Sequence, residues 1–306
     1  HAAAPALVPL FERRDHWFVF GNNHANKIKG DERAQLIGIF DLHLDRAQEL
    51  AAKHGVKGFD NLEEFLSQID ALVVATPAVA HGGVARAALN AGKHCLVEKP
   101  LAASAEDATI LCEISEAKGL VLQAGHQERY IFKAMGLLDV KEAPIAIEAA
   151  RIGLPSVRGS DVSATLDLMV HDLDLAYLLF KSEPKEIEAK LLAGDKSKPD
   201  AIEANIIYEN GSKAKFIASR AAEERDRKTK IIYKNGSVEI DYIARTFEDT
   251  TPFGLHKDFA ERIKDPMQQA MSDFISAILG EIPVAIPARD GEHAVKIAQA
   301  IDNSIL

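Results

Sequence analysis

The sequence predicts an α/β protein in two parts, a doubly wound parallel sheet followed by an α+β region with a largely antiparallel, open sheet. Short apolar runs alternate with helical stretches from Ala34 to Ala124, which is typical of a parallel sheet covered by helices on both faces. After about residue 145, strand-like runs follow one another instead. Asn210-Gly211 and Asn235-Gly236 each separate two such runs, and this dipeptide indicates a hairpin.

The helices of the first half are marked by residues that start or stop a helix. Gly55 and Gly119 follow two helical stretches as C-terminal caps, and Asn61 precedes another as its N-terminal cap. The expected strands are Leu36–Phe40, Ala71–Ala75, Cys95–Val97 and Leu120–Ala124, and the expected helices are Asp45–His54, Asn61–Ser67, Gly82–Asn90 and Ser104–Lys118.

The second half combines strands with three longer helices. The expected strands are Ala146–Arg151, Glu186–Leu192, Ala201–Tyr208, Lys213–Ser219, Thr229–Tyr233 and Ser237–Tyr242, and the expected helices are Ser163–Phe180, Met267–Leu279 and Gly291–Asn303. A chain of 306 residues predicts two domains. We place them at residues 1–124 and 125–306, with a C-terminal helix that could pack back on the first domain.

Composition narrows the class of partner. The chain has 46 acidic and 36 basic residues and a net charge of −10, which disfavours nucleic acid and anionic membrane surfaces as main partners. The two cysteines, Cys95 and Cys112, lie in segments that we expect to be buried, so neither a disulfide framework nor a thiolate metal site is expected. We find no apolar run long enough to span a membrane, and residues 1–10 lack the basic start of a signal peptide. A cytoplasmic protein is therefore expected.

Asp41 follows the first strand of the parallel sheet. In a dinucleotide-binding fold an acidic residue at this point accepts hydrogen bonds from the adenosine ribose. Its charge would repel the 2′-phosphate of NADP, which favours NAD, although Arg46 lies nearby. The alternative is an ordinary acidic residue in a turn.

The loop that should cradle the pyrophosphate is irregular. Such a loop needs glycines for a tight turn and a close approach of the backbone. Counting back from Asp41, Gly21 fits the third glycine, whereas His16 and Phe18 occupy the first two positions. Alternatively, Gly21 is the first glycine and Asn22-Asn23-His24 forms a polar loop, because asparagine tolerates the left-handed conformation. Both alternatives make Gly21, Asn22 and Asn23 candidate cofactor contacts.

A carboxylate and an ammonium end the next-to-last strand of this sheet. Glu98 and Lys99 follow Cys95-Leu96-Val97 directly. Open α/β sheets bind ligands at the carboxyl ends of their strands. The pair is therefore a candidate for the site, although the same tripeptide with Pro100 also occurs in surface turns.

Asp167 and His171 lie four residues apart and therefore on one face of the expected helix. A carboxylate one turn from an imidazole can orient the ring and favour its protonated form, as a general base near neutral pH requires. A structural pair in a helix interface is the alternative. A metal site formed with Asp172 and Asp174 is less favoured, because no second histidine has ligand spacing, and we expect no metal.

Four motifs in this order are similar to those of a known enzyme family, the Gfo/Idh/MocA oxidoreductases. The likeness runs from about His24 to the C-terminus. The motifs are Ala75-Thr76-Pro77 with His81, Ala91-Gly92-Lys93-His94 running into Glu98-Lys99-Pro100, Gly125-His126-Gln127-Glu128-Arg129-Tyr130, and Asp167 with His171-Asp172-Leu173-Asp174.

The resemblance implies an N-terminal dinucleotide-binding Rossmann domain and a C-terminal domain for substrate binding and oligomerisation, usually as dimers or tetramers. It implies hydride transfer between a nicotinamide and a sugar, nucleotide sugar or cyclitol. Lys99 would polarise the reacting hydroxyl, His171 would take its proton, and Asp167 would orient substrate or histidine. Thr76, Pro77, His81 and Glu98 would line the cofactor. The pair His24-Ala25 supports Gly21 as the third loop glycine.

The substrate is suggested by two segments, residues 125–130 and 166–174, which resemble the branch that acts on UDP-N-acetylhexosamines or their uronates at the 3-hydroxyl. Gln127, Arg129 and Asp172 are the substrate candidates from these segments. Arg129, Arg151 and Arg158 could meet a phosphate or carboxylate, but each could equally be a structural arginine.

The chain departs from the family over its first twenty residues, where Glu12-Arg13-Arg14-Asp15 would be a poor central strand. Three explanations remain open: a loss of cofactor binding, a different N-terminal path, and an error in this part of the sequence. The alternative function is accordingly a non-catalytic ligand-binding or regulatory relative. A metal-dependent lyase or hydrolase built on the aspartate-histidine helix is a third hypothesis.

Overall fold

A computed structural model describes residues 16–156 and 159–305, without the side chains of residues 16–20. It divides into two compact units. Unit 1 contains the described residues up to His126 together with Met267–Glu292, and unit 2 contains Gln127–Pro266 and the residues after Glu292. The sequence-based division placed everything after residue 124 in the second domain, whereas Met267–Glu292 returns to the first.

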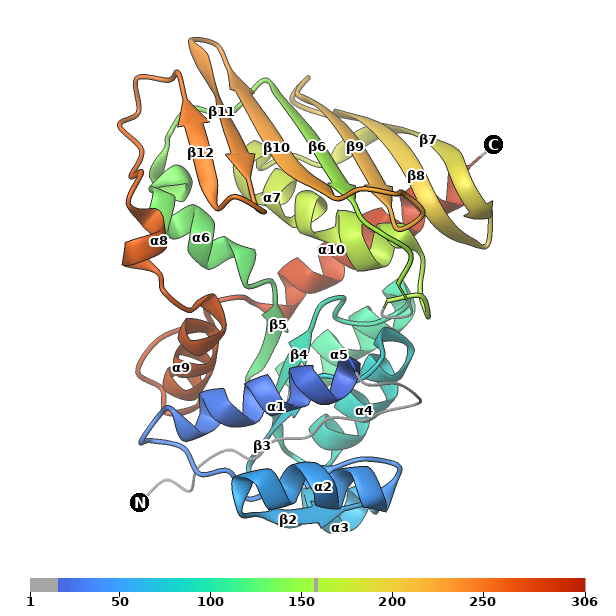
Figure 1. Ribbon diagram of the computed structural model, residues 1–306, viewed down its shortest axis with the longest axis vertical. Coiled ribbons are helices and arrows are strands. Elements are labelled where there is room, and N and C mark those ends of the chain that lie inside the picture. The colour runs from blue at the N-terminus through green and yellow to red at the C-terminus, as the bar shows by residue number, and fades with distance from the viewer. Residues whose placement is uncertain (1–15, 157–158, 306) are drawn as a thin grey trace. The chain divides into compact units, whose positions relative to one another are not determined.

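Unit 1 is built from parallel strands and helices that alternate along the chain (Figure 1). Within the described residues, β1 pairs with β2 in one parallel sheet, and β3, β4 and β5 form another with β4 in the middle. The strands are β1 (Gly38–Phe40), β2 (Lys57–Phe59), β3 (Ala71–Val74), β4 (His94–Glu98) and β5 (Leu122–Gly125), and the helices are α1 (His16–Lys29), α2 (Leu44–His54), α3 (Leu62–Leu66), α4 (Ala78–Asn90), α5 (Ala105–Lys118) and α9 (Pro266–Ile278).

The caps predicted from the sequence fix the helix ends in unit 1. The side chain of Asn61 accepts a hydrogen bond from the Glu64 amide, and Ser104 does the same for Asp107. Gly55 and Gly119 adopt the left-handed conformation at the ends of α2 and α5, where a residue with a Cβ would be strained. The caps predicted at Asn61, Gly55 and Gly119 are confirmed, and Ser104 is a further cap that was not predicted from the sequence.

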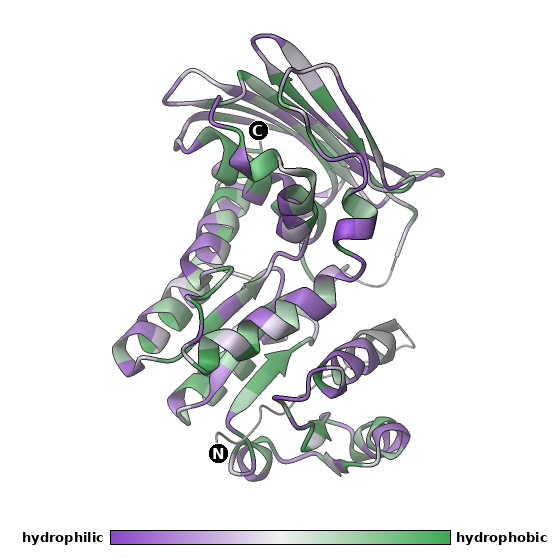
Figure 2. Cartoon of the chain, turned by 90° about the vertical axis from the view of Figure 1, so that its left-hand side faces the viewer, coloured by the Kyte–Doolittle hydropathy of each residue, from purple (hydrophilic) through white to green (hydrophobic). Residues whose placement is uncertain are grey.

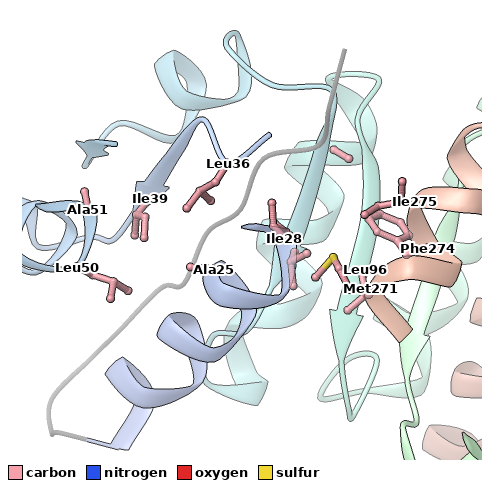
Figure 3. Packing of buried hydrophobic residues seen from close by; sticks show 12 residues of the cluster. Ala25, Ile28, Leu36, Ile39, Leu50, Ala51, Leu96, Met271, Phe274 and Ile275 are labelled. Atoms are coloured by element: carbon pink, nitrogen blue, oxygen red, sulfur yellow. The ribbon is translucent and has the colours of Figure 1, made fainter. Parts of the chain in front are cut away.

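A buried apolar cluster joins both sheets of unit 1 to helices from distant parts of the sequence (Figure 3). Ala25 and Ile28 of α1 and Leu96 of β4 lie in the same cluster as Met271 and Phe274 of α9. Burial of a large apolar side chain contributes about 2 kcal/mol. Helix α9 is therefore part of this core, although it follows the whole of the antiparallel sheet in the chain.

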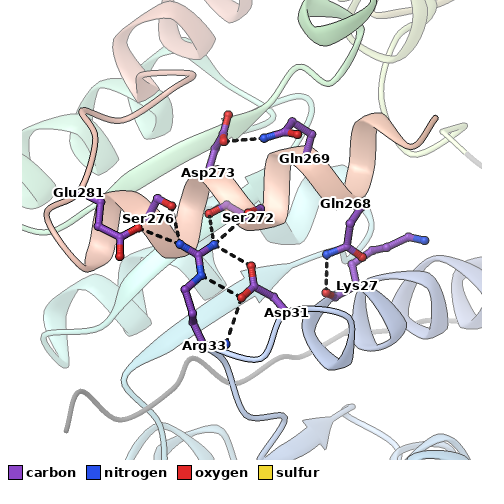
Figure 4. A network of polar contacts seen from close by, with 9 residues as sticks. All are labelled: Lys27, Asp31, Arg33, Gln268, Gln269, Ser272, Asp273, Ser276 and Glu281. Carbon is purple, nitrogen blue, oxygen red and sulfur yellow. Dashed lines mark hydrogen bonds and ion pairs between the residues drawn. The ribbon is translucent and has the colours of Figure 1, made fainter. Parts of the chain in front are cut away.

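A polar network also ties α9 to the segment after α1 (Figure 4). The Arg33 guanidinium donates to Asp31, Ser272, Ser276 and Glu281, at 2.7–3.2 Å. The Arg33 side chain is 35% exposed, so water competes for these contacts.

Unit 2 contains one seven-stranded sheet in the order β12-β11-β10-β6-β9-β8-β7. All its pairs are antiparallel except β6 with β9, so the predicted fold class is confirmed. Asn210-Gly211 lies in the hairpin turn between β8 and β9, and Asn235 lies in the turn between β10 and β11, directly before Gly236, the first residue of β11. The strands are β6 (Ala146–Ile152), β7 (Pro184–Asp195), β8 (Lys198–Tyr208), β9 (Lys213–Ser219), β10 (Asp226–Tyr233), β11 (Gly236–Asp241) and β12 (Thr246–Asp249).

The sheet of unit 2 is apolar on one face. Buried and exposed residues alternate along β8 and β9, and Figure 2 shows the corresponding bands of green and purple along the strands. Helix α7 (Val170–Phe180) lies on the apolar face, where Phe180 contacts Tyr208 with 4.7 Å between ring centroids. The remaining helices of this unit are α6 (Glu128–Met135), the short 3₁₀ helix η1 (Leu137–Asp139), α8 (Phe259–Arg262) and the end of α10 (Ala288–Asn303).

The expected helix Ser163–Phe180 is not regular. Residues Thr165–Met169 form a π-helix, η2, and only Val170–Phe180 is α-helical. Asp302 of α10 accepts hydrogen bonds from the hydroxyls of Ser163 and Thr165 at the start of this segment. Apolar periodicity does not distinguish a π turn from an α turn, and π turns occur mainly at functional sites.

Candidate functional site

The candidate residues of unit 1 lie at the carboxyl ends of its parallel strands. Asp41 follows β1, Thr76 and Pro77 stand between β3 and α4, and Lys99 follows β4. Because β3 and β4 are parallel and in register, Thr76 and Lys99 lie at the same edge of their sheet. This is the edge where open α/β sheets bind ligands.

Asp41 carries an unsatisfied buried oxygen. The side chain is almost inaccessible, and its Oδ1 accepts a hydrogen bond of 2.8 Å from the His43 amide. Its Oδ2 is buried and has no partner among the described residues. Burial raises the pKa of Asp41 to about 6. A buried acceptor without a donor is costly, and a ribose hydroxyl would satisfy it.

Glu98 is buried against His24 of α1. Its Oε1 lies 2.7 Å from His24 Nε2. Burial alone would raise the pKa of Glu98, but the His24 hydrogen bond and the nearby charges of His24, Lys99 and His81 hold it below its ordinary value. A Cβ at Gly125 would lie 2.8 Å from the Glu98 Cα, so the close approach of β5 to Glu98 requires glycine.

His81 joins the segments that follow β3 and β4. Its Nδ1 lies 2.6 Å from the Pro100 carbonyl oxygen and its Nε2 lies 2.9 Å from that of Thr76. Both ring nitrogens thus contact main-chain oxygens. The geometry shows His81 holding the two segments that carry Thr76 and Lys99.

Gly21, Asn22 and Asn23 are helical rather than in a loop, because α1 begins at His16. The alternative in which Asn22-Asn23-His24 forms the polar loop is therefore wrong. Asn22 Oδ1 lies 2.9 Å from His54 Nε2 of α2. The side chains of His16 and Phe18, which stand where loop glycines were expected, lie outside the described side chains.

The candidate residues of unit 2 surround a buried arginine. Arg151 Nε donates to Asp172 Oδ2 at 2.9 Å, and its Nη1 and Nη2 donate to the two oxygens of Glu128 at 2.9 and 2.7 Å. The guanidinium also lies over the Tyr242 ring, 4.8 Å from the centroid. Although burial opposes the charge, Asp172 and Glu128 raise the pKa of Arg151 well above its ordinary value.

His171, at the second position of α7, faces this cluster. Its Nδ1 lies 3.7 Å from Glu128 Oε1, which is the distance of an ion pair rather than a hydrogen bond. Asp167 belongs to the π-helix, and its carboxylate lies so close to Gly159 that a Cβ there would be 2.0 Å from Oδ2. Gly159 has a positive φ of 75°.

Two of the three substrate candidates form buried ion pairs. Arg129 donates to both oxygens of Asp174, and both side chains are buried. Asp172 is completely buried against Arg151. These contacts favour structural roles for Arg129 and Asp172, because a fixed charge pair gains little from releasing its partner to a ligand. Gln127 precedes α6.

Sequence reasoning assigned no role to Glu128 or Arg227. Glu128 lies within one of the four family motifs, but no helix was expected at residues 128–135, where α6 begins with Glu128. Arg227 of β10 stands directly opposite Arg151 of β6, a pairing that depends on sheet register and has no local signal. The described part of the chain contains no cluster of three or more metal-ligating side chains. None of its described helices is long and apolar enough to cross a membrane.

Two family models match this chain. The model described as "Oxidoreductase family, NAD-binding Rossmann fold" matches residues 18–126, and the "GFO/IDH/MocA C-terminal domain" matches residues 158–239. Together they cover more than half of the sequence.

Among curated proteins, the UDP-N-acetylglucosamine 3-dehydrogenase of Acidithiobacillus ferrooxidans is 36% identical over 176 residues, which are 56% of each chain. The glucose-6-phosphate 3-dehydrogenase of Bacillus subtilis is 28% identical over 55% of this chain and 53% of its own. The chain thus spans about half the length of the curated relatives it matches. A crystal form of the A. ferrooxidans protein superimposes with a TM-score of 0.85 and 29% identity, over 99% of this chain and 98% of that chain.

Proposed function

Because the chain belongs to the Gfo/Idh/MocA oxidoreductase family, we propose that it is an NAD-dependent oxidoreductase acting on a hydroxyl-bearing carbon of a sugar, nucleotide sugar or cyclitol. The buried, unpartnered Oδ2 of Asp41 carries the proposal. It stands where a dinucleotide fold needs an acceptor for a ribose hydroxyl.

The residues of unit 1 would hold the cofactor. Asp41 would accept from the ribose hydroxyl, and its negative charge would disfavour the 2′-phosphate of NADP. The nicotinamide, when bound, supplies a hydride acceptor. The remaining cofactor contacts would be Gly21, Asn22, Asn23, Thr76, Pro77, His81 and Glu98.

The chemistry would be divided between three side chains. Lys99 Nζ would donate to the substrate hydroxyl and stabilise negative charge as it develops on that oxygen. The hydroxyl proton would pass to His171 as the carbon loses its hydride. Asp167 would orient the substrate or the histidine. Proton and hydride together account for the two hydrogens lost when an alcohol becomes a carbonyl.

A nucleotide sugar is the first substrate to test, because the A. ferrooxidans relative is named for UDP-N-acetylglucosamine. Gln127 remains the substrate candidate of the 125–130 segment. We also propose a cytoplasmic homodimer or homotetramer, as the family resemblance suggests.

One observation favours a second candidate function. His16 and Phe18 replace the first two glycines expected in the pyrophosphate loop, and bulky side chains there would obstruct the phosphates. A relative that binds a ligand without turning over NAD would retain the fold and lose only cofactor binding.

Direct titration of NADH and NADPH into the purified protein tests the proposal. Micromolar binding that is tighter for NADH is expected, followed by NAD reduction with UDP-N-acetylglucosamine. Lys99→Ala should reduce turnover by about 10² or more without weakening NADH, whereas Lys93→Ala, at the other end of β4, should change neither. Absence of binding to folded protein would favour the non-catalytic alternative.

A further inference from the structure

The Glu128 carboxylate is bound by Arg151 and faces His171. Both of its oxygens accept from the Arg151 guanidinium, at 2.9 and 2.7 Å. The oxygen bound to Nη1, Oε1, is also 3.7 Å from His171 Nδ1. The Glu128 and His171 side chains are 22% and 19% exposed, whereas Arg151 is 3% exposed. The carboxylate therefore lies between a buried cation and a histidine that solvent can reach.

The guanidinium that holds Glu128 is itself fixed. Asp172 binds its Nε at 2.9 Å, and the Tyr242 ring covers one face. Forked contacts of this kind define the plane of both groups. The two contacts from Arg151 therefore hold the Glu128 carboxylate in one orientation.

Helix α7, which carries His171, also contributes Asp172 to this network. Asp172 is the next residue after His171 in α7, and it anchors the arginine of β6 that holds the glutamate of α6. Asp172 pairs with Arg151, and Glu128 supplies the carboxylate oxygen that lies 3.7 Å from the imidazole Nδ1. Among the described residues, Arg227 on β10 and Tyr242 also lie near Glu128 and Arg151, and Arg227 lies near Asp167 as well.

We propose that Glu128 is the positioning residue of His171, because its carboxylate favours a proton on Nδ1 and the imidazolium form of the ring. The effect on turnover rests on the proposed function. The histidine-carboxylate pair itself does not, because it is a property of unit 2 alone. A carboxylate against one ring nitrogen fixes the tautomer and favours the imidazolium that forms when the other nitrogen gains a proton.

This assignment differs from the one made on sequence spacing, which gave Asp167 the orienting role. Asp167 lies in the π-helix with its carboxylate packed against Gly159, and it remains a candidate for contact with substrate. The two carboxylates can be separated by experiment, because only Glu128 is predicted to control the proton affinity of Nδ1.

The direct test is an NMR titration of histidine ring resonances, with His171→Asn used to assign the His171 signal. Glu128→Gln should lower the pKa of His171 by about one unit, because the imidazolium loses a neighbouring anion. Glu128→Asp, which keeps the charge, should restore at least half of that shift. Glu209→Gln is the matched control. It removes the same charge from the exposed β8–β9 turn beside Tyr208, which contacts the far end of α7.

The turnover test separates the inference from the proposed function. In an active enzyme, Glu128→Gln should lower kcat about tenfold or more, leave NADH affinity unchanged and move the acidic limb of the kcat profile to lower pH. If Glu128→Gln shifts the His171 titration but the protein has no dehydrogenase activity, the proposed function is wrong and the pairing of Glu128 with His171 is supported. Normal turnover with an unchanged pH profile in Glu128→Gln would overturn the inference.

Circular dichroism and the remaining histidine signals show whether each variant is folded. Glu128→Gln keeps an oxygen that can accept from Arg151, and Asp172 still pairs with that guanidinium. Should Glu128→Gln fail to fold, Glu128→Ala is titrated in its place: a His171 pKa about one unit below that of wild type agrees with the proposal, and a pKa equal to that of wild type contradicts it.

Discussion

His24 and His171 each face a glutamate, but the two pairs differ in distance and in access to water. His24 Nε2 lies 2.7 Å from Glu98 Oε1, with side chains that are 1% and 11% exposed. His171 Nδ1 lies 3.7 Å from Glu128, with both side chains about one-fifth exposed. The first pair resembles a structural tie between α1 and β4, and the second is partly accessible to water.

The difference in burial implies a difference in how much each pair contributes to stability. A buried pair cannot exchange protons with a ligand without first opening, and opening leaves charges in a medium of low dielectric. A partly exposed pair loses little on opening, but it also contributes little to stability. The predictions that follow test this contrast from the strongest expected effect to the weakest.

The buried pair should give the largest loss of stability. Glu98→Ala leaves the His24 ring without its partner, and we expect the free energy of unfolding to fall by about 3 kcal/mol. Urea unfolding followed by circular dichroism measures it. Glu113→Ala, on the exposed side of α5, should stay within about 0.5 kcal/mol of wild type. Equal losses of stability in the two variants would show that the buried pair contributes no more than an exposed glutamate.

Asp41 extends the comparison to a buried carboxylate that has no histidine. Its pKa is raised to about 6 by burial, and the ionised form is the better acceptor for a ribose hydroxyl. NADH affinity should therefore fall by about tenfold for each pH unit below 6 and stay constant above it. Calorimetric titration across this range checks the slope. Asp41→Asn should bind NADH weakly at every pH, and a slope that persists in this variant would exclude Asp41 as its source.

Acid should weaken the buried pair of Glu98 and His24. The folded-state pKa of Glu98 is below its ordinary value, because the His24 hydrogen bond and neighbouring positive charges outweigh burial. The stabilisation is complete above the unfolded pKa of about 4.3 and is lost as pH falls through the folded value. Wild type should therefore lose stability more steeply than Glu98→Gln below pH 4.5. Parallel curves would contradict the assignment.

The exposed Arg33 network should give the smallest effect. It makes more hydrogen bonds than either histidine pair, but at 35% side-chain exposure water replaces most of what Arg33→Ala removes. We expect a loss of at most about 1 kcal/mol. Adding 1 M salt should reduce this loss, whereas the effect of Glu98→Ala should barely change. A loss that resists salt would mean that the network is less hydrated than its exposure suggests.

Local signals in the sequence were sufficient for most of the fold. Asn61, Ser104, Gly55 and Gly119 each determine a helix end through their own side chain or backbone conformation, so their effect can be predicted without knowing the neighbours. The two Asn-Gly turns are local in the same sense. Strand β2 was missed, because Gly58 interrupts a strand of three residues and only its pairing with β1 makes it a strand.

The candidate site was predicted less completely, because its ion pairs join distant segments. Glu128, Arg151 and Asp172 come from α6, β6 and α7, and no spacing in the sequence relates them. Asp172 and Arg129 were assigned to substrate because they lie in the family motifs, whereas the structure gives each a buried partner of opposite charge. The roles of Lys99, His171 and Asp167 stay predictions.

The return of the chain to unit 1 has a consequence for its synthesis on the ribosome. Met271, Phe274 and Ile275 of α9 complete the cluster that contains Ala25 and Leu96, yet they are translated only after every strand of the antiparallel sheet. The nascent first unit therefore keeps part of its apolar surface exposed while the strands of unit 2 are synthesised, and chaperones bind such surfaces. The core of unit 1 is thus synthesised in two separate parts of the chain. Expression of residues up to His126 alone would produce a unit that lacks the apolar side chains of α9.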